Sequence, residues 1–190
     1  MQNEPNLKII GKELVKKYNL SQYRKYFTFD FDINFDNFDN FDNSNDPNKL
    51  NKTNKIIKNF IRTNLNIDFD ENYIDIIHKK IADDGLNWHI DDCVIVTKKS
   101  EPIYNKERYI KISDSKYLYF HNRFNRLPTK TIIFYSSTFR IDFDGGILQF
   151  ADDTIIKPEK YTGLIFDSRE AHCVTPIKSG NRYVSLIKIY

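Results

Sequence analysis

Hydrophobic residues repeat with two different periods along the chain. In the first third, apolar residues recur every three or four positions, a spacing typical of amphipathic helices. This spacing predicts one helix over residues 6–18 and a second, basic helix over residues 49–64. The inward positions would be Leu7, Ile10, Leu14 and Tyr18 in the first helix, and Leu50, Ile57, Phe60 and Ile61 in the second.

From about residue 72 the period changes to two. Short segments rich in β-branched and aromatic residues follow one another, and turn residues separate them, which is typical of strands. They read YIDIIHKKI, WHIDDCVIV, RYIKI, KYLYF, TKTIIFYSS, GILQF, TIIKP, GLIFD and RYVSLIKIY. So many short strands predict a sandwich or jelly roll, and helices followed by strands indicate an α+β fold.

The segment between the two helices has a biased composition. Residues 27–48 read FTFDFDINFDNFDNFDNSNDPN, with an FDN triplet that repeats from Phe35. A period of three matches neither a strand nor a helix, so we expect a linker or surface loop. A calcium loop built from Asp42, Ser44 and Asp46 would need a central glycine and a closing glutamate, and both are missing. We therefore divide the chain into an N-terminal helical and Asn/Asp/Phe-rich low-complexity region, 1–70, and a β-rich domain, 71–190.

Composition narrows the class of protein. The chain has 190 residues, 40% of them apolar, which is enough for a full hydrophobic core. Its net charge of +3 does not indicate a partner. Cys93 and Cys173 are the only cysteines, which excludes a disulfide framework and favours a reducing compartment. No segment has the apolar core of a signal peptide or the ~18 apolar residues of a membrane span. We expect a soluble, cytoplasmic protein.

Candidate metal ligands lie in WHIDD, residues 88–92. On an extended strand, positions i and i+2 face the same side, so His89 and Asp91 could converge on one ion. A third ligand would come from His121, in a polar stretch without further distinguishing context, or from His172, near a strand end. Taken one at a time, these residues are better explained as ordinary polar or buried positions.

Further motifs follow in a fixed order. Gly145 and Gly146 precede a short apolar segment, and Arg182 follows His172 by 10 residues. WHIDD (88–92), TIIFYSS (131–137), GGILQF (145–150) and GLIFDSREAHCVTPIKSGNRYVSLIKIY (163–190) together resemble the iron(II)- and 2-oxoglutarate-dependent dioxygenases, most closely the prolyl 4-hydroxylase-like branch. The resemblance covers the chain from about residue 73, and residues 1–70 add nothing to it.

The resemblance implies a fold and a site. Residues 71–190 would form a double-stranded β-helix, a jelly roll, as the dioxygenase domain. His89, Asp91 and His172 would be both the catalytic residues and the ligands of Fe(II), and Arg182 and Tyr135 would bind the far carboxylate of 2-oxoglutarate. O2 would be the second cosubstrate, with ascorbate as a candidate reductant. The implied reaction hydroxylates a C–H bond, on a protein or peptide side chain such as proline, and converts 2-oxoglutarate to succinate.

Two departures from the family pattern stand out. Residues 93–130 are unusually long for the corresponding connection, and Val184 replaces a residue that often carries a hydroxyl. Within 98–130, basic residues exceed acids by about six and alternate with aromatics, a composition that can bind nucleic acid. We favour the simpler interpretation of a solvated hairpin whose aromatic side chains cover the barrel. Cys93 and Cys173 adjoin predicted ligands but would face away from them, as buried, non-ligating residues.

Two alternative functions stay open. A nucleic-acid oxidative demethylase would share the chemistry, but relatives of that kind have a wider gap after the last histidine and a second arginine where this chain has Lys188. A catalytically silent jelly-roll binding module would have no need of His89, Asp91 and His172. Substrate identity rests on the resemblance alone.

Overall fold

The protein is described here from a computed structural model, which covers residues 5–33, 35, 47–82, 85–97, 109–124 and 126–190. Its elements in chain order are α1 (Pro5–Tyr18), η1 (Leu20–Tyr23), β1 (Lys25–Thr28), α2 (Pro47–Thr63), η2 (Glu71–Tyr73), β2 (Ile74–Ile81), β3 (Leu86–His89), β4 (Cys93–Thr97), β5 (Tyr109–Lys111), β6 (Lys116–Phe120), β7 (Lys130–Tyr135), β8 (Phe143–Gly145), β9 (Leu148–Phe150), β10 (Ile155–Ile156), β11 (Thr162–Asp167), β12 (His172–Val174), β13 (Ile177–Gly180) and β14 (Arg182–Ile189). No helix within these ranges is long and apolar enough to cross a membrane.

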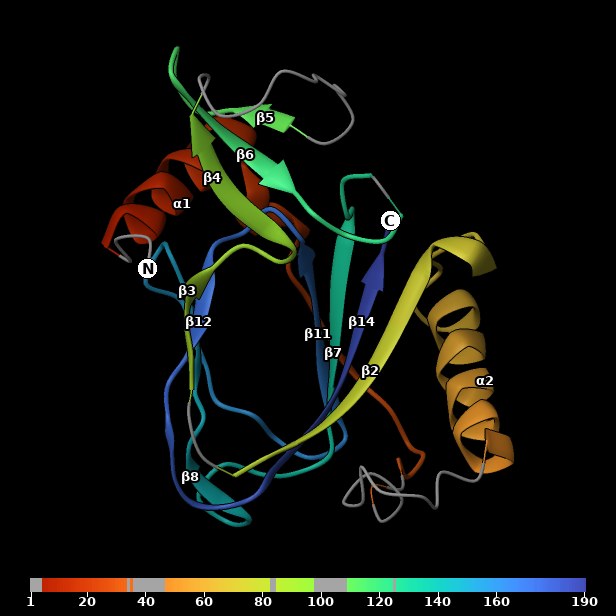
Figure 1. The fold of residues 1–190 in the computed structure, drawn as a ribbon. Helices are drawn as coiled ribbons and strands as arrows, with labels where there is room; N and C mark the ends of the chain where they lie inside the picture. Colours follow the sequence, from red (N-terminus) through yellow and green to blue (C-terminus); the bar gives the residue numbers. More distant parts are fainter. Residues whose placement is uncertain (1–4, 34, 36–46, 83–84, 98–108, 125) are drawn as a thin grey trace.

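Two antiparallel sheets form the body of the molecule (Figure 1). The larger has the strand order β1-β11-β7-β14-β2, and the smaller has the order β10-β9-β12-β3. Their facing sides bury one apolar cluster, which draws on β7, β9, β10, β11, β12 and β14. From β2 onward the chain passes back and forth between the two sheets, with β2, β7, β11 and β14 in the larger and β3, β9, β10 and β12 in the smaller, as in a double-stranded β-helix. The predicted α+β jelly roll is therefore confirmed.

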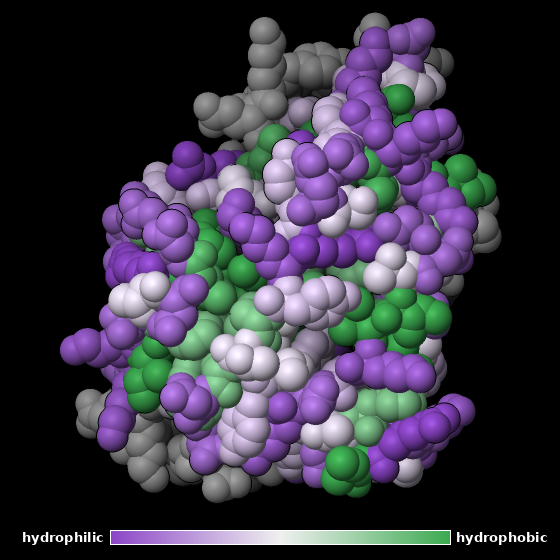
Figure 2. Space-filling view, turned by 180° about the vertical axis from the view of Figure 1, so that it is seen from behind, coloured by the Kyte–Doolittle hydropathy of each residue, from purple (hydrophilic) through white to green (hydrophobic). Residues whose placement is uncertain are grey.

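The alternation of side chains along β7 gives the larger sheet two buried faces. Ile133 and Tyr135 point into the space between the sheets, whereas Ile132 and Phe134 point outward, toward α2. From α2, Ile57 and Ile61 are fully buried against that outer face, and burial of each stabilises the fold by roughly 1.5–3 kcal/mol. The rear view shows an apolar patch on the half of the molecule where α2 lies and further apolar side chains on the opposite half (Figure 2).

The helix α1 packs beside the smaller sheet, close to the segment that leads into β12. Gly11 permits this approach, because a Cβ at this position would lie 2.8 Å from the Cβ of Ala151 and closer still to that of Ala171. Ile10 and Leu14, one helical turn apart, are buried in the same cluster. The helix predicted over 6–18 is confirmed, and the one predicted over 49–64 corresponds to α2.

Two expectations from the sequence were wrong. Residues 88–96 do not form one strand, because β3 ends at His89 and a turn follows, in which Asp92 has a φ of 53°. The phenylalanine-rich segment is not a surface loop over its first part, since β1 pairs with β11 and the side chains of Phe29, Ile33 and Phe35 enter the core. Most of the FDN repeat and the rejected calcium loop lie outside the described residues.

Candidate active site

Three predicted ligands converge between the two sheets. His89 ends β3 and His172 begins β12, and the two residues are partners in the register of these neighbouring strands. Asp91 lies in the turn after β3. One ligand atom from each of the three residues lies within 4.8 Å of the other two. The structure therefore brings the three predicted ligands together, and a turn, not strand alternation, brings Asp91 to the histidines.

Backbone carbonyls orient both imidazole rings. The Nδ1 of His89 lies 2.7 Å from the carbonyl oxygen of Asn87, and the Nδ1 of His172 lies 2.9 Å from that of Glu170. A carbonyl can only accept, so each Nδ1 carries a hydrogen, and the Nε2 of a neutral ring so oriented keeps a free lone pair. Burial, together with the neighbouring His89, lowers the pKa of His172 to about 4. His172 is therefore neutral at physiological pH, as a metal ligand must be.

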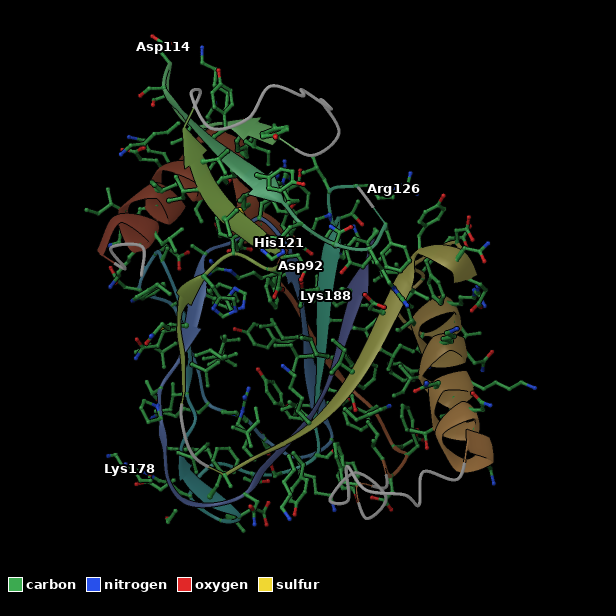
Figure 3. The ribbon with its side chains drawn as sticks, in the orientation of Figure 1. Asp92, Asp114, His121, Arg126, Lys178 and Lys188 are labelled. Atoms are coloured by element: carbon green, nitrogen blue, oxygen red, sulfur yellow. The ribbon has the colours of Figure 1, made fainter. Side chains whose placement is uncertain are left out.

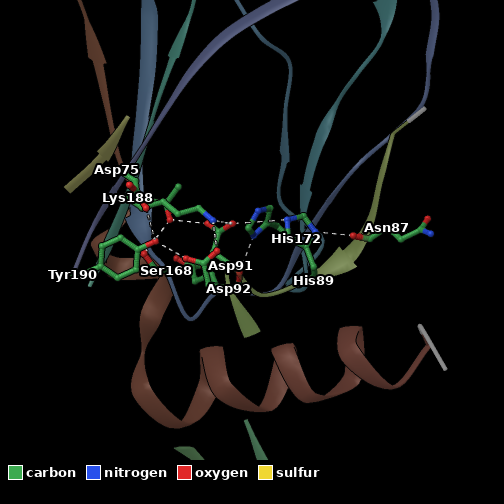
Figure 4. Close-up of polar contacts among 11 residues, drawn as sticks. Asp75, Asn87, His89, Asp91, Asp92, Ser168, His172, Lys188 and Tyr190 are labelled. Atoms are coloured by element: carbon green, nitrogen blue, oxygen red, sulfur yellow. Dashed lines mark hydrogen bonds and ion pairs between the residues drawn. The ribbon is translucent and has the colours of Figure 1, made fainter. Parts of the chain in front are cut away.

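The carboxylate of Asp91 is ionised and held at both oxygens (Figure 4). Burial opposes ionisation, but His172, Lys188 and other neighbours outweigh it and keep the pKa of Asp91 below its usual value. Thr131 Oγ1 donates to Asp91 Oδ2 at 2.8 Å. Asp91 Oδ1 lies 4.0 Å from His89 Nε2 and 3.3 Å from Lys188 Nζ. The oxygen that faces the histidines is thus Oδ1.

Lys188 links Asp91 to a second carboxylate, Asp92. The Nζ of Lys188 donates to Asp92 Oδ1 at 2.7 Å, and the hydroxyl of Tyr190 donates to Asp92 Oδ2 at 2.5 Å. Burial works against the charge on Lys188, but the two carboxylates outweigh it and raise its pKa. Lys188, Asp92 and His121 lie close together beneath the β4–β6 hairpin (Figure 3). Lys188 thus offsets one of the two negative charges on this side of the site.

Arg182 lies on the same face of β14 as Lys188 and is a buried cation. Arg182 is 3% exposed, and the described residues offer it no ion pair. Its Nε and the hydroxyl of the adjacent Tyr135 are both buried, and the part of the chain that the structure describes gives neither of them a hydrogen-bond partner. Burial lowers the pKa of Arg182, which Tyr135 partly offsets, and burial raises the pKa of Tyr135 to about 12. Unsatisfied groups of this kind are costly, and a ligand carboxylate would satisfy both of them.

The candidate ligands and Arg182 share one cavity of about 350 Å³. Its walls are mainly aliphatic, with contributions from Ile133, Leu148, Val174, Val184 and Leu186. Tyr135 does not line the cavity and supports Arg182 from beside it. The cavity borders both edge strands β2 and β3, where Ile77 is 37% exposed and Leu86 is 46% exposed.

An ion network from the N-terminal region holds the segment before His172. The Nε of Arg24 donates to the buried Glu170 at 2.8 Å, and its Nη1 lies 2.9 Å from Asp152. The guanidinium also stacks over the ring of Phe150, 4.0 Å from its centroid. Because the carbonyl of Glu170 orients His172, this network fixes the position of a candidate ligand.

Several residues around the site were missed at the sequence level. His121, considered only as a possible third ligand, lines the cavity. Thr131 and Lys188 contact Asp91, and Ser168 contacts Thr131, and none of these three was assigned a role. Strand alternation could have indicated two of them, because Thr131 shares a strand face with Tyr135, and Lys188 with Arg182. Val184 lies between Arg182 and Lys188 on the same face of β14 and also lines the cavity.

One of the two cysteines differs from the expectation that both are buried and face away from the ligands. Ser185 points away from the cavity and contacts His78 Nδ1 at 2.7 Å. Cys173 is buried. Cys93 is only half-buried and lines the cavity, and burial raises its pKa, so it is a thiol and a poor ligand.

The described part of the basic and aromatic segment 98–130 contributes β5 and β6 to a small sheet with the strand order β4-β6-β5. Leu118 and Phe120 are buried under it, against the cluster that includes α1, whereas Tyr109 and Tyr119 stack with ring centroids 5.0 Å apart. Three of its cations have partners: Lys111 pairs with Asp114, Arg123 with Asp75, and Arg126 lies over the ring of Tyr73. These contacts agree with the hairpin interpretation. Residues 98–108 and 125 lie outside the described part.

Comparisons with known proteins give a distant likeness. No protein-family model and no curated protein matches the chain. Similar solved structures include a viral collagen prolyl hydroxylase from Paramecium bursaria Chlorella virus-1 in complex with 2-oxoglutarate, at 15% identity over 96% of this chain and 90% of that one, with a TM-score of 0.43. A prolyl-4-hydroxylase from Pseudomonas putida is 11% identical over 98% of this chain and 82% of that one, with a TM-score of 0.42. These values are too low to carry an argument about function.

Proposed function

We propose that the protein is an Fe(II)- and 2-oxoglutarate-dependent dioxygenase that hydroxylates a C–H bond. One observation carries the proposal: three possible metal ligands share one mainly aliphatic cavity with a buried arginine that has no ion pair among the described residues. Two neutral imidazoles and one carboxylate are the donor set of non-haem Fe(II) oxygenases, and they leave coordination positions open for other ligands. Arg182 supplies the planar fork that binds a carboxylate in two places.

The residues of the chain fit the groups that this function requires. His89, Asp91 and His172 would hold Fe(II), and Arg182 with Tyr135 would hold the far carboxylate of 2-oxoglutarate. When bound with O2, these groups supply the oxidation: 2-oxoglutarate loses CO2 and becomes succinate, and a substrate C–H becomes C–OH. The aliphatic wall excludes water around Arg182 and strengthens its attraction for an anion.

The proposed substrate is a side chain of a protein or peptide. The cavity borders two edge strands, and the described part of each pairs on one side only. An extended chain can add to such edges through backbone hydrogen bonds. Exposed Ile77 and Leu86 would flank it with apolar contacts.

Succinate release tests the proposal. Purified protein is given Fe(II), 2-oxoglutarate, ascorbate and O2, with and without proline-containing peptides, beside a His172→Ala control. We expect succinate from the unaltered protein, none from the variant, and a peptide product heavier by one oxygen atom. If 2-oxoglutarate is not consumed and neither Fe(II) nor 2-oxoglutarate binds, the protein is a silent jelly-roll module. Oxidation of methylated DNA in place of peptide would support the demethylase.

A further inference from the structure

A buried chain of two hydroxyl groups ends on the carboxylate of Asp91. Thr131 Oγ1 lies 2.8 Å from Asp91 Oδ2, and Ser168 Oγ lies 2.9 Å from Thr131 Oγ1. Thr131 and Ser168 are both fully buried, so water does not compete for these contacts. They come from β7 and from the segment after β11, two neighbouring strands of the larger sheet.

The direction of both hydrogen bonds follows from which of the three groups carry a proton. A carboxylate only accepts, so Thr131 must donate its single hydroxyl proton to Asp91. Thr131 then has only lone pairs left for Ser168, so Ser168 donates to Thr131. Two aligned hydroxyls in a dry interior polarise each other and strengthen the final bond to Asp91.

This bond determines how the carboxylate is rotated. With Oδ2 held by Thr131, Oδ1 is the oxygen that faces His89 Nε2, at 4.0 Å. Lys188 approaches that same Oδ1 at 3.3 Å, so it does not hold the carboxylate from the opposite side. Without Thr131, Asp91 could turn toward Lys188 and present neither oxygen to the histidines.

We infer that Thr131, supported by Ser168, is a positioning residue that fixes the carboxylate of Asp91 for metal binding. The inference rests on the proposed function, because it assumes that Asp91 is a metal ligand. Residues that hold the ligands of a metal typically contribute about 10- to 100-fold to its affinity. A merely structural hydroxyl would contribute to folding stability and leave the metal affinity unchanged.

The test measures Co(II) binding to the full chain, by competition with a chromophoric chelator and by the visible absorption of the bound ion. We expect Thr131→Val to bind Co(II) about 10-fold or more weakly, with an altered spectrum. Thr131→Ser keeps the hydroxyl, so it should restore the affinity to within about threefold and regain the spectrum. The matched control is Thr129→Val, which removes a hydroxyl bonded to the carbonyl of Ile189 at 3.1 Å, away from the ligands; its affinity should be unchanged.

Several outcomes would overturn the inference. Thr131→Val with wild-type affinity and spectrum, and a loss of stability like that of Thr129→Val, would make Thr131 structural only. If Thr131→Val does not fold, Ser168→Ala decides, because it releases Thr131 from its donor; several-fold weaker binding supports the inference and equal binding overturns it. Failure of the unaltered protein to bind Co(II) better than His172→Ala would instead overturn the proposed function, and this inference with it.

Discussion

Replacing Arg182 by Met should stabilise the ligand-free protein and abolish its response to 2-oxoglutarate. The arginine is 3% exposed, and its Nε has no partner. Methionine has a similar reach and fills the space of the aliphatic stem, which passes Gly146, without carrying a charge. The ligand-free protein becomes more stable while the stabilisation by 2-oxoglutarate is lost. A purely structural residue would not show this combination.

The magnitudes follow from burial and from linkage. Replacing a buried, poorly compensated charge with an apolar side chain of similar volume typically changes stability by about 0 to +4 kcal/mol, and we expect about +1 to +2 kcal/mol here because Tyr135 compensates part of the charge. In the unaltered, metal-loaded protein, 2-oxoglutarate at about 100 times its Kd should add about 2.7 kcal/mol to the free energy of unfolding. In the variant this increment should vanish.

Urea denaturation with Co(II) in place of Fe(II) measures both quantities, with and without 2-oxoglutarate. A conservative control is Arg182→Lys, which keeps the charge but loses the fork, and should retain a reduced increment. The reasoning fails if Arg182→Met loses about 3 kcal/mol of stability while 2-oxoglutarate still stabilises it. Arg182 would then be a structural residue whose partner the account has missed.

Three further predictions concern other residues. Gly146→Ala should weaken 2-oxoglutarate binding and leave Co(II) affinity intact, because a Cβ at this position, where φ is 58°, would lie 3.0 Å from the Cδ of Arg182; titration calorimetry with each ligand would check this. Lys188→Met should cost the metal-free protein about 3 kcal/mol, since two carboxylates lose their cation, and bound Co(II) should restore most of it in urea melts. Burial lowers the pKa of His78 to about 4 in the folded state, against an ordinary value of 6.5. The neutral form is thus favoured by folding: this stability is fully present above pH 6.5 and is lost as pH falls toward 4, and the loss at pH 5 is at most about 2 kcal/mol. His78→Gln should flatten the fall in unfolding free energy between pH 7 and pH 5, and an unchanged slope would contradict the assignment.

Local patterns predicted much of the fold. The helical period marked α1 and α2, and alternation marked most of the strands, because each signal lies within one short segment. The prediction of one strand over residues 88–96 was wrong for a physical reason. Their apolar alternation continues across Asp92, whose left-handed backbone breaks the strand, and non-glycine residues rarely adopt that conformation. The order of strands in the sheets could not be read from single segments at all.

The candidate site, too, could be predicted from the sequence only in part. His89, Asp91 and His172 were grouped from the sequence because a motif order connects them. Thr131 lies 40 residues from Asp91, and Ser168 lies 37 residues from Thr131, with no motif to connect them. Composition misled in one place: Phe29, Ile33 and Phe35 look like low-complexity sequence but pack against the sheet and α2. Which apolar residues of a repetitive segment are buried depends on contacts that the segment does not encode by itself.

The central claim is that one cavity binds a metal and 2-oxoglutarate together. Calorimetric titration of 2-oxoglutarate into anaerobic protein, with and without Fe(II), measures this directly, with His172→Ala as the control. We predict one 2-oxoglutarate per chain, bound at least about 10-fold more tightly with Fe(II) than without, a coupling of about 1.4 kcal/mol or more, which the control loses. Binding that is absent, or equally strong with and without Fe(II), would contradict the account.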